Sequence, residues 1–447
     1  MIDIALSRRA LFARLGGAAL FTRMGRMNAL AQTSASDYKA LVCIFLVGGN
    51  DGHNTVVPLE QAQFNAYKAA RGALALPDNN GPVVPVSTPN GTPYGLNNGL
   101  SPLQPLWTQN KLAVVANVGM LVQPTTRQQF LTGTVPLPTN LFSHSDQIAQ
   151  MQSGVPSTSG GTGWAGRAAD SLVAANGAAS FPASVSMAGP ALFCTGNVVQ
   201  SASFLPGNDL TMDGMSLWPQ AAADARKTGV QQLLHLDSGL ALVQAANKVR
   251  KDAMDLNALL NGLSASINTP FPGTTLGRQL LQVAKVIKLR PTTGMKRQVF
   301  FCSLGGFDTH GSQSWHHWDL LRQVGLAMSA FYNATIELGV ADSVTAFTQS
   351  DFGRTLQPSG SGCDHGWGNH NVVLGGAVQG GQLYGTFPTM ALGGPDDAGN
   401  RGVMIPTTSL DQYGATLASW FGVPPAQLGT VFPNLNNFPT ANLGFLG

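Results

Sequence analysis

The chain has 447 residues, of which 44% are hydrophobic and only 11% are charged, and its formal net charge is +3. This composition excludes a disordered chain, which would combine low hydrophobicity with high net charge. We expect no transmembrane segment, because no apolar run reaches the roughly 18–20 residues that a membrane-spanning helix needs. Residues 1–31 hold five arginines and one aspartate, which leaves a net charge of −1 for the remainder and argues against nucleic acid as a partner.

The first 31 residues are predicted to be a twin-arginine export signal and not part of the fold. Arg8 and Arg9 precede a short apolar stretch at 15–21, and the small-x-small triplet 29–31 is typical of a signal-peptidase site. We therefore expect the twin-arginine translocase as a partner during export, and a periplasmic or secreted location. A short amphipathic N-terminal helix is the alternative.

The rest of the chain alternates between predicted strands and helices. Buried strands are expected at apolar, β-branched-rich runs, at 40–47, 112–118, 298–304 and 343–347. Helices are expected where apolar residues recur with helical spacing, at 209–225, 231–263, 276–287, 315–338 and 410–421. Segments rich in Gly, Pro, Ser, Thr and Asn are expected to be loops, at 76–110 and 152–165. This order predicts one α/β domain over 32–447, with a mostly parallel central sheet sandwiched by helices and a mainly helical insertion at 200–290.

The four cysteines show no metal-binding spacing, and they are too few for a disulfide framework in a chain of this length. Cys43 and Cys302 lie inside predicted strands, where buried thiols are expected. A single disulfide between two of the four cysteines is the alternative that the sequence leaves open.

Histidine and aspartate residues gather in segments that follow the predicted strands. Asp51 lies in a glycine-rich segment after the first strand, and Asp308 and His310 follow the third. Ligands gather outside the carboxyl ends of strands in open α/β sheets, and residues two apart in an extended chain point to the same side. Asp308 and His310 can therefore reach one ion. The structural alternative for Asp51 is a turn residue that caps the next segment.

A third segment, after the last predicted strand, is the richest in candidate ligands. Asp351 and Arg354 are followed by Asp364, His365 and His370. Carboxylate and imidazole groups suit zinc, manganese or iron, and carboxylate-rich sites also suit calcium or magnesium. Arg354 can clamp an anionic group with its fork of donors, or it can pair with an acid of the site.

A nucleophile is sought at the predicted helix start 141–147. Ser143 at the N-terminus of such a helix, facing a metal ion, can become an alkoxide, and the helix dipole favours a bound oxyanion. An ordinary N-cap serine is the equally weighted alternative.

Seven stretches that span almost the whole chain after residue 31 resemble one family, in the same order. They are LVCIFLVGGNDGHNTVVP (41–58), FSHSDQ (142–147), GWAGR (163–167), GGFDTHGSQ (305–313), TQSDFGRT (348–355), DHGWGNHNVVLGGAVQGG (364–381) and DQYGATLASWFGV (411–423). The chain thus resembles the twin-arginine-exported bacterial proteins with domain of unknown function 1501, in the alkaline phosphatase and sulfatase superfamily.

The resemblance implies an alkaline-phosphatase-like fold with one or two divalent ions, zinc, manganese or calcium, at the strand ends. It makes Ser143 the best candidate nucleophile, and it implies a set of metal ligands, namely Asp51, Asp308, His310, Asp351, Asp364, His365 and His370. The superfamily usually has histidine directly after the strand-end acid, whereas Phe352 follows Asp351 here. The sulfatase signature is absent near Ser143.

These features predict a metal-dependent hydrolase of phosphate or sulfate esters, with a small anionic ester as its substrate. The alternative is a non-catalytic, metal-binding exported protein, a binding or assembly factor that keeps the fold. A dinucleotide-dependent oxidoreductase has little support, because no G-x-G-x-x-G motif follows the first strand.

Overall fold

The computed structural model describes residues 37–157, 161–177, 179, 181–203, 205–206, 216–236, 239–247, 250–251, 254 and 266–447. The predicted export signal at 1–31 lies outside these residues. Lys39–Gly447 form one unit, to which the following description applies. None of the described helices combines the length and the apolar character that a membrane crossing requires.

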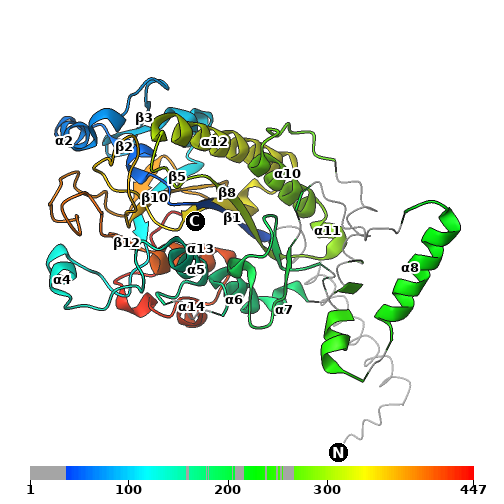
Figure 1. Cartoon of the computed structure of the whole chain (residues 1–447). Coiled ribbons are helices and arrows are strands. Elements are labelled where there is room, and N and C mark those ends of the chain that lie inside the picture. Colours follow the sequence, from blue (N-terminus) through cyan, green and yellow to red (C-terminus); the bar gives the residue numbers. More distant parts are fainter. Residues whose placement is uncertain are drawn as a thin grey trace, which may run out of the picture. The chain divides into compact units, whose positions relative to one another are not determined.

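The centre of this unit is a mixed, mostly parallel sheet (Figure 1). Four strands form at the predicted apolar runs: β1 (Lys39–Val47), β5 (Leu112–Gly119), β8 (Arg297–Gly305) and β9 (Val344–Ser350). Five others join them: β6 (Ser184–Ser186), β7 (Ser201–Ser203), β10 (Asn369–Gly375), β11 (Gln382–Tyr384) and β12 (Thr408–Ser409). Within the described residues the order is β11-β5-β10-β9-β1-β8-β6-β7, with β12 beside β5. The predicted α/β class is confirmed.

Strand β1 lies between β8 and β9 and is parallel to both. Cys43 lies opposite Phe301 on one side and opposite Phe347 on the other. The carboxyl ends of these three strands therefore lie side by side at one edge of the sheet. Strand β10 runs antiparallel to its neighbours β5 and β9.

Helices cover both faces of the sheet, which explains why its strands are continuous apolar runs. On one side lie α10 (Thr275–Lys288) and α12 (Gln313–Glu337), and on the other α5 (His144–Ser153), α6 (Trp164–Asp170), α13 (Leu410–Phe421) and α14 (Leu428–Val431) (Figure 1). Leu41, Cys43 and Phe45 of β1 pack with the second set in one buried cluster. All four cysteines are buried and free, as predicted for Cys43 and Cys302.

The segment 76–110, predicted to be loop, contains ordered elements. Strands β3 (Val84–Ser87) and β4 (Pro93–Leu96) form a small antiparallel sheet with β2 (Val56–Pro58). Their Gly and Pro content hides them in the sequence, because short strands with one buried face need only a few apolar residues. Five further α-helices belong to the unit: α2 (Gln61–Arg71), α3 (Gln104–Thr108), α4 (Arg127–Thr132), α7 (Val173–Asn176) and α11 (Arg290–Thr293).

The predicted insertion at 200–290 is described in part. Helix α8 (Gln220–Leu234) is largely exposed, whereas α10 is packed against β8 and α12. Much of the predicted helix at 231–263 and the start of the one at 209–225 lie outside the described residues.

Candidate metal centre

Two consecutive glycines shape the loop that follows β1. Gly48 and Gly49 have φ values of +114° and +81°, which L side chains rarely adopt. Their N–H groups donate to Oδ1 of Asp351, at the end of β9, over 3.0 and 2.8 Å. A Cβ on Gly49 would lie 2.6 Å from the ring of Phe352. The two glycines thus allow the loop after β1 to pack closely against Asp351 and Phe352, which follow β9.

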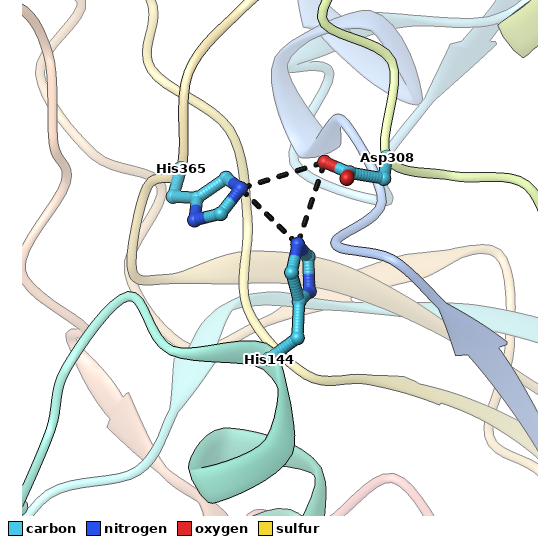
Figure 2. A group of neighbouring side chains, drawn as sticks. All are labelled: His144, Asp308 and His365. Carbon is cyan, nitrogen blue, oxygen red and sulfur yellow. Dashed lines mark hydrogen bonds and ion pairs between the residues drawn. The ribbon is translucent and has the colours of Figure 1, made fainter.

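Beside this loop, side chains from three separate segments converge (Figure 2). His144 is the first residue of α5, Asp308 follows β8, and His365 lies between β9 and β10. The Nε2 atoms of the two histidines are 3.1 Å apart, and each lies 3.4 Å from Oδ1 of Asp308. Nε2 of His310 lies 3.0 Å from both Nε2 of His365 and the same Asp308 oxygen. Two imidazoles and one carboxylate therefore converge, and a third imidazole, that of His310, lies beside two of them.

The far nitrogens of two rings fix how these imidazoles are protonated. Nδ1 of His144 lies 2.6 Å from Oδ2 of Asp351, and Nδ1 of His365 lies 2.7 Å from the carbonyl oxygen of Phe142. Both oxygens accept hydrogen bonds, so each Nδ1 carries a proton, and a ring without a second proton presents a lone pair at Nε2. Two such lone pairs and a carboxylate oxygen that face one another repel unless a proton or a metal cation lies among them. Histidine metal ligands are held in this way by acceptors on their far nitrogen.

The spacing of the donor atoms fits the same interpretation. Two nitrogens that each lie about 2.1 Å from one zinc ion, at tetrahedral or octahedral angles, are roughly 3.0–3.4 Å apart. The separations among His144, His365 and Asp308, and those of His310 from His365 and Asp308, fall within this range. A set dominated by imidazole nitrogen favours zinc, manganese or iron over calcium, which prefers oxygen ligands.

The electrostatics of the cluster keep its acid charged. Partial burial opposes ionisation of Asp308, but Arg354 and the neighbouring histidines together hold the pKa of Asp308 below its usual value. The hydrogen bond to Asp351 raises the pKa of His144, whereas burial lowers the pKa of His365. The centre thus combines one carboxylate with imidazoles of different basicity.

Arg354 is buried and its donors are taken up by the protein. It donates to the carbonyl oxygens of Gly48 and Gly49 after β1, to those of Phe307 and Cys363, and to Asp308. Of the two roles that the sequence allowed, the geometry shows pairing with an acid of the site. Arg354 ties together the loops that present the cluster.

Two predicted ligands lie outside the converging set. Asp51 forms a buried ion pair with Arg71. Nδ1 of His370 accepts the N–H of Asn117 over 3.0 Å, and its ring stacks on Phe387 with centroids 4.6 Å apart. The structure therefore does not bring Asp51 and His370 into the cluster around Asp308, and their polar atoms contact other protein groups.

Two further predicted ligands contact the histidines instead of the shared point. Asp351 accepts from Nδ1 of His144, as described above, and Oδ1 of Asp364 lies 3.4 Å from Nδ1 of His310. The other oxygen of Asp364 lies 2.6 Å from Arg401. Both acids therefore contact imidazoles at Nδ1, on the side of the ring away from the Nε2 atoms that face Asp308.

Ser143 occupies the N-cap position of α5, but its side chain caps no backbone N–H. Its hydroxyl donates to Oδ2 of Asp146 over 2.5 Å. The helix-start pattern points to Ser143 as a nucleophile and does not indicate that His144, its neighbour, is a ligand. The available signal was the position of His144 in the stretch FSHSDQ, one of those shared with the resembled family.

Comparisons with known proteins agree with the family expected from the sequence. A family model described as "Protein of unknown function (DUF1501)" matches residues 107–400. No protein with a curated description matches the chain in sequence. Among solved structures, the sulfatase PsFucS1 from Pseudoalteromonas sp. is similar with a TM-score of 0.36 and 10% identity, over 95% of this chain and 73% of that one. The phosphonate monoester hydrolase of Agrobacterium radiobacter is similar with a TM-score of 0.30 and 11% identity, over 87% and 74%.

Proposed function

The chain belongs to the DUF1501 family, and we propose that it is a metal-dependent hydrolase of phosphate or sulfate esters. The observation that carries this proposal is the convergence of His144, His365 and Asp308, with Nε2 lone pairs and a carboxylate oxygen directed at one point. A divalent ion bound there supplies Lewis acidity, which polarises an ester oxygen and lowers the pKa of water. Zinc or manganese is the proposed ion.

The residues of the proposed site have two separate roles, binding the ion and orienting its ligands. His144, His365 and Asp308 hold the ion, and Nε2 of His310 lies 3.0 Å from two of their ligand atoms. Asp351 and the carbonyl of Phe142 keep two of the imidazoles in the tautomer that binds metal. These outer acceptors also keep the rings from turning, so that the donor atoms stay in place during reaction.

An anionic substrate is supported by the exposed rim of the centre. Asp308 and His310 are each 48% exposed, so this side is open to a ligand. Arg401, 47% exposed, contacts Asp364 through one terminal nitrogen, and Asp364 in turn contacts His310. Arg401 therefore offers a charged donor at the rim, which suits the oxygens of a phosphate or sulfate group. We assign it the anion contact that Arg354, being enclosed, does not provide.

Water is the proposed attacking group, in place of Ser143. The hydroxyl of Ser143 is committed to Asp146, and this contact holds the pKa of Asp146 below its usual value. A carboxylate of lowered pKa is a poor base, so it does not activate the serine.

The second candidate function is a non-catalytic metal-binding protein. It is favoured by the hydrogen bonds of Ser143 to Asp146 and of Arg354 to Gly48 and Asp308. Because of these hydrogen bonds, neither Ser143 nor Arg354 is free to act on a substrate. In this case the ion stabilises the fold and no ester is turned over.

We further propose that the protein acts in the periplasm or outside the cell after twin-arginine export. Arg8 and Arg9 support this location. Replacing both by lysine should retain the full-length precursor in the cytoplasmic fraction, and unchanged export of that variant would contradict the proposal.

The hydrolase is tested with p-nitrophenyl phosphate and p-nitrophenyl sulfate, on protein stripped with a chelator and reloaded with zinc or manganese. We expect the wild type to turn over the substrate. We expect His365→Ala to lose its bound metal and to have activity at least about 100-fold lower. His316→Ala, which removes an exposed histidine outside the cluster, is the matched control and should retain both. Full metal content in His365→Ala would contradict the assignment of His365 as a metal ligand. Bound metal without turnover in the wild type would favour the non-catalytic candidate.

A further inference from the structure

The carboxylate at the end of β1 is neutralised by the protein itself. Asp51 is fully buried, and one oxygen pairs with Arg71 and accepts from Gln313. Its other oxygen accepts the N–H of Asn54 over 3.3 Å. A buried carboxylate requires a positive partner and satisfied lone pairs. Asp51 obtains both without a metal ion.

Arg71 is fixed in this place. It is the last residue of α2, is fully buried, and donates through Nε to Oδ1 of Asn54 over 3.0 Å. One terminal nitrogen donates to the carbonyl oxygens of Thr355 and Leu356 over 2.8 and 3.0 Å. A guanidinium remains charged at any ordinary pH and cannot serve as a ligand. A second cation beside Asp51 would be repelled by it.

The other strand-end acid has no free oxygen either. The two oxygens of Asp351 accept from the N–H groups of Gly48 and Gly49 and from His144. The next residue, Phe352, is buried and packs its ring 4.7 Å from the ring of His144 and 4.8 Å from that of His365. An aromatic ring thus covers the imidazoles on this side, where it offers no metal ligand.

Among the described residues, the other buried histidines do not form a second group of metal ligands. The rings of His53 and His370 lie 6.4 Å apart, and His370 already accepts from Asn117. Across the described part of the chain, His144, Asp308 and His365 form a group of three metal-capable side chains whose ligand atoms lie within 4.8 Å of one another. His310, His365 and Asp308 meet the same limit, and both groups belong to one cluster because they share His365 and Asp308.

We infer that the centre takes a single metal ion per chain, and that Arg71 supplies the fixed positive charge that neutralises Asp51. This inference rests on the proposed metal-dependent function and restricts it to chemistry on one ion. It assigns Asp51 and Arg71 a structural role, as a buried charge pair outside the metal site.

Metal counting on the full chain tests the inference. Chelator-stripped protein is equilibrated with zinc, passed through a weak chelator that removes surface-bound ions, and analysed by mass spectrometry of the metal. We expect one zinc per wild-type chain and less than about 0.1 in His365→Ala. The double variant Asp51→Asn/Arg71→Gln, which removes both buried charges together, should still bind one.

The outcomes separate the two proposals. Two tightly bound ions in the wild type would overturn the single-ion inference and leave the metal-dependent function standing. No bound ion in the wild type would refute the metal centre itself. If the double variant does not fold, as judged by circular dichroism, the wild-type count decides alone. A folded double variant without zinc would place Asp51 in the metal site and contradict its structural role.

Discussion

In both His144 and His365, Nδ1 donates a hydrogen bond to a protein acceptor and Nε2 points toward Asp308. The identity of the acceptor decides which ring nitrogen is left to bind the proposed ion. A carboxylate behind His144 keeps the proton on Nδ1, whereas an amide could donate to that nitrogen and place the proton on Nε2 instead.

Asp351→Asn tests this dependence. The variant keeps an oxygen for the N–H groups of Gly48 and Gly49 but can present N–H to His144. We expect zinc affinity to fall about 10–100-fold, measured by competition with a chromogenic chelator. Asp319→Asn, which alters an acid on α12 that is paired with Arg322, is the control and should bind zinc as the wild type does. Unchanged affinity in Asp351→Asn would show that the tautomer is set by something else.

Ser143→Ala distinguishes water from serine as the attacking group. The serine side chain caps no backbone N–H of α5, so its removal should change stability by less than about 0.5 kcal/mol. We expect kcat on p-nitrophenyl phosphate to fall less than about 5-fold, with metal content unchanged. A loss of roughly 1,000-fold with full metal content would identify Ser143 as the nucleophile.

The sequence led to part of the cluster because its residues are rare and follow recognisable strands. Asp308, His310 and His365 were all selected for this reason, and the structure brings them together. Asp51 follows a strand in the same way, but its pairing with Arg71 depends on a contact across the fold. His144 begins a helix, and the pattern of a helix start does not tell which strand ends it faces.

Strand prediction succeeded for the elements that carry the site. The runs at 40–47, 112–118 and 298–304 are largely apolar because helices cover both faces of the sheet. Strand β10 was not predicted, because Asn and His residues at its start break the apolar pattern. Its buried polar side chains are stabilised by tertiary contacts, such as the hydrogen bond between His370 and the N–H of Asn117.

Gly49→Ala tests how tightly the end of β1 is packed against the site. The added Cβ would overlap the Phe352 ring and would impose a φ of +81° on alanine. We expect a loss of about 2–4 kcal/mol in the free energy of unfolding, measured by urea denaturation, together with weaker zinc binding. Gly91→Ala is the matched control, since Gly91 has a φ of +84° with nothing within 4 Å of the added Cβ. It should lose only about 1 kcal/mol. Equal losses in both variants would contradict a packing role for Gly49.

At the level of the whole molecule, one acid outside the site should govern how stability depends on pH. Asp411, in the first turn of α13, is fully buried, and burial raises the pKa of its carboxyl to about 7. The folded chain therefore binds this proton more tightly than the unfolded chain does. The stabilisation is complete below about pH 4 and is lost as the pH rises through 7.

Asp411→Asn should remove this dependence, because an amide does not titrate. Relative to the variant, the wild type should lose up to about 4 kcal/mol of unfolding free energy between pH 4 and pH 8, measured by urea denaturation across the range. Asp342→Asn, near the start of β9, provides the control for removing an acid. Parallel curves for the wild type and Asp411→Asn would mean that Asp411 titrates normally in the folded chain.

A crystal of the zinc-loaded protein, measured at the zinc absorption edge, tests the metal centre most directly. We predict one anomalous peak per chain, bounded by Nε2 of His144 and His365 and by Oδ1 of Asp308, with His310 beside it. A peak beside Asp51 or His370 instead, or no peak under conditions in which zinc is bound in solution, would contradict the assignment.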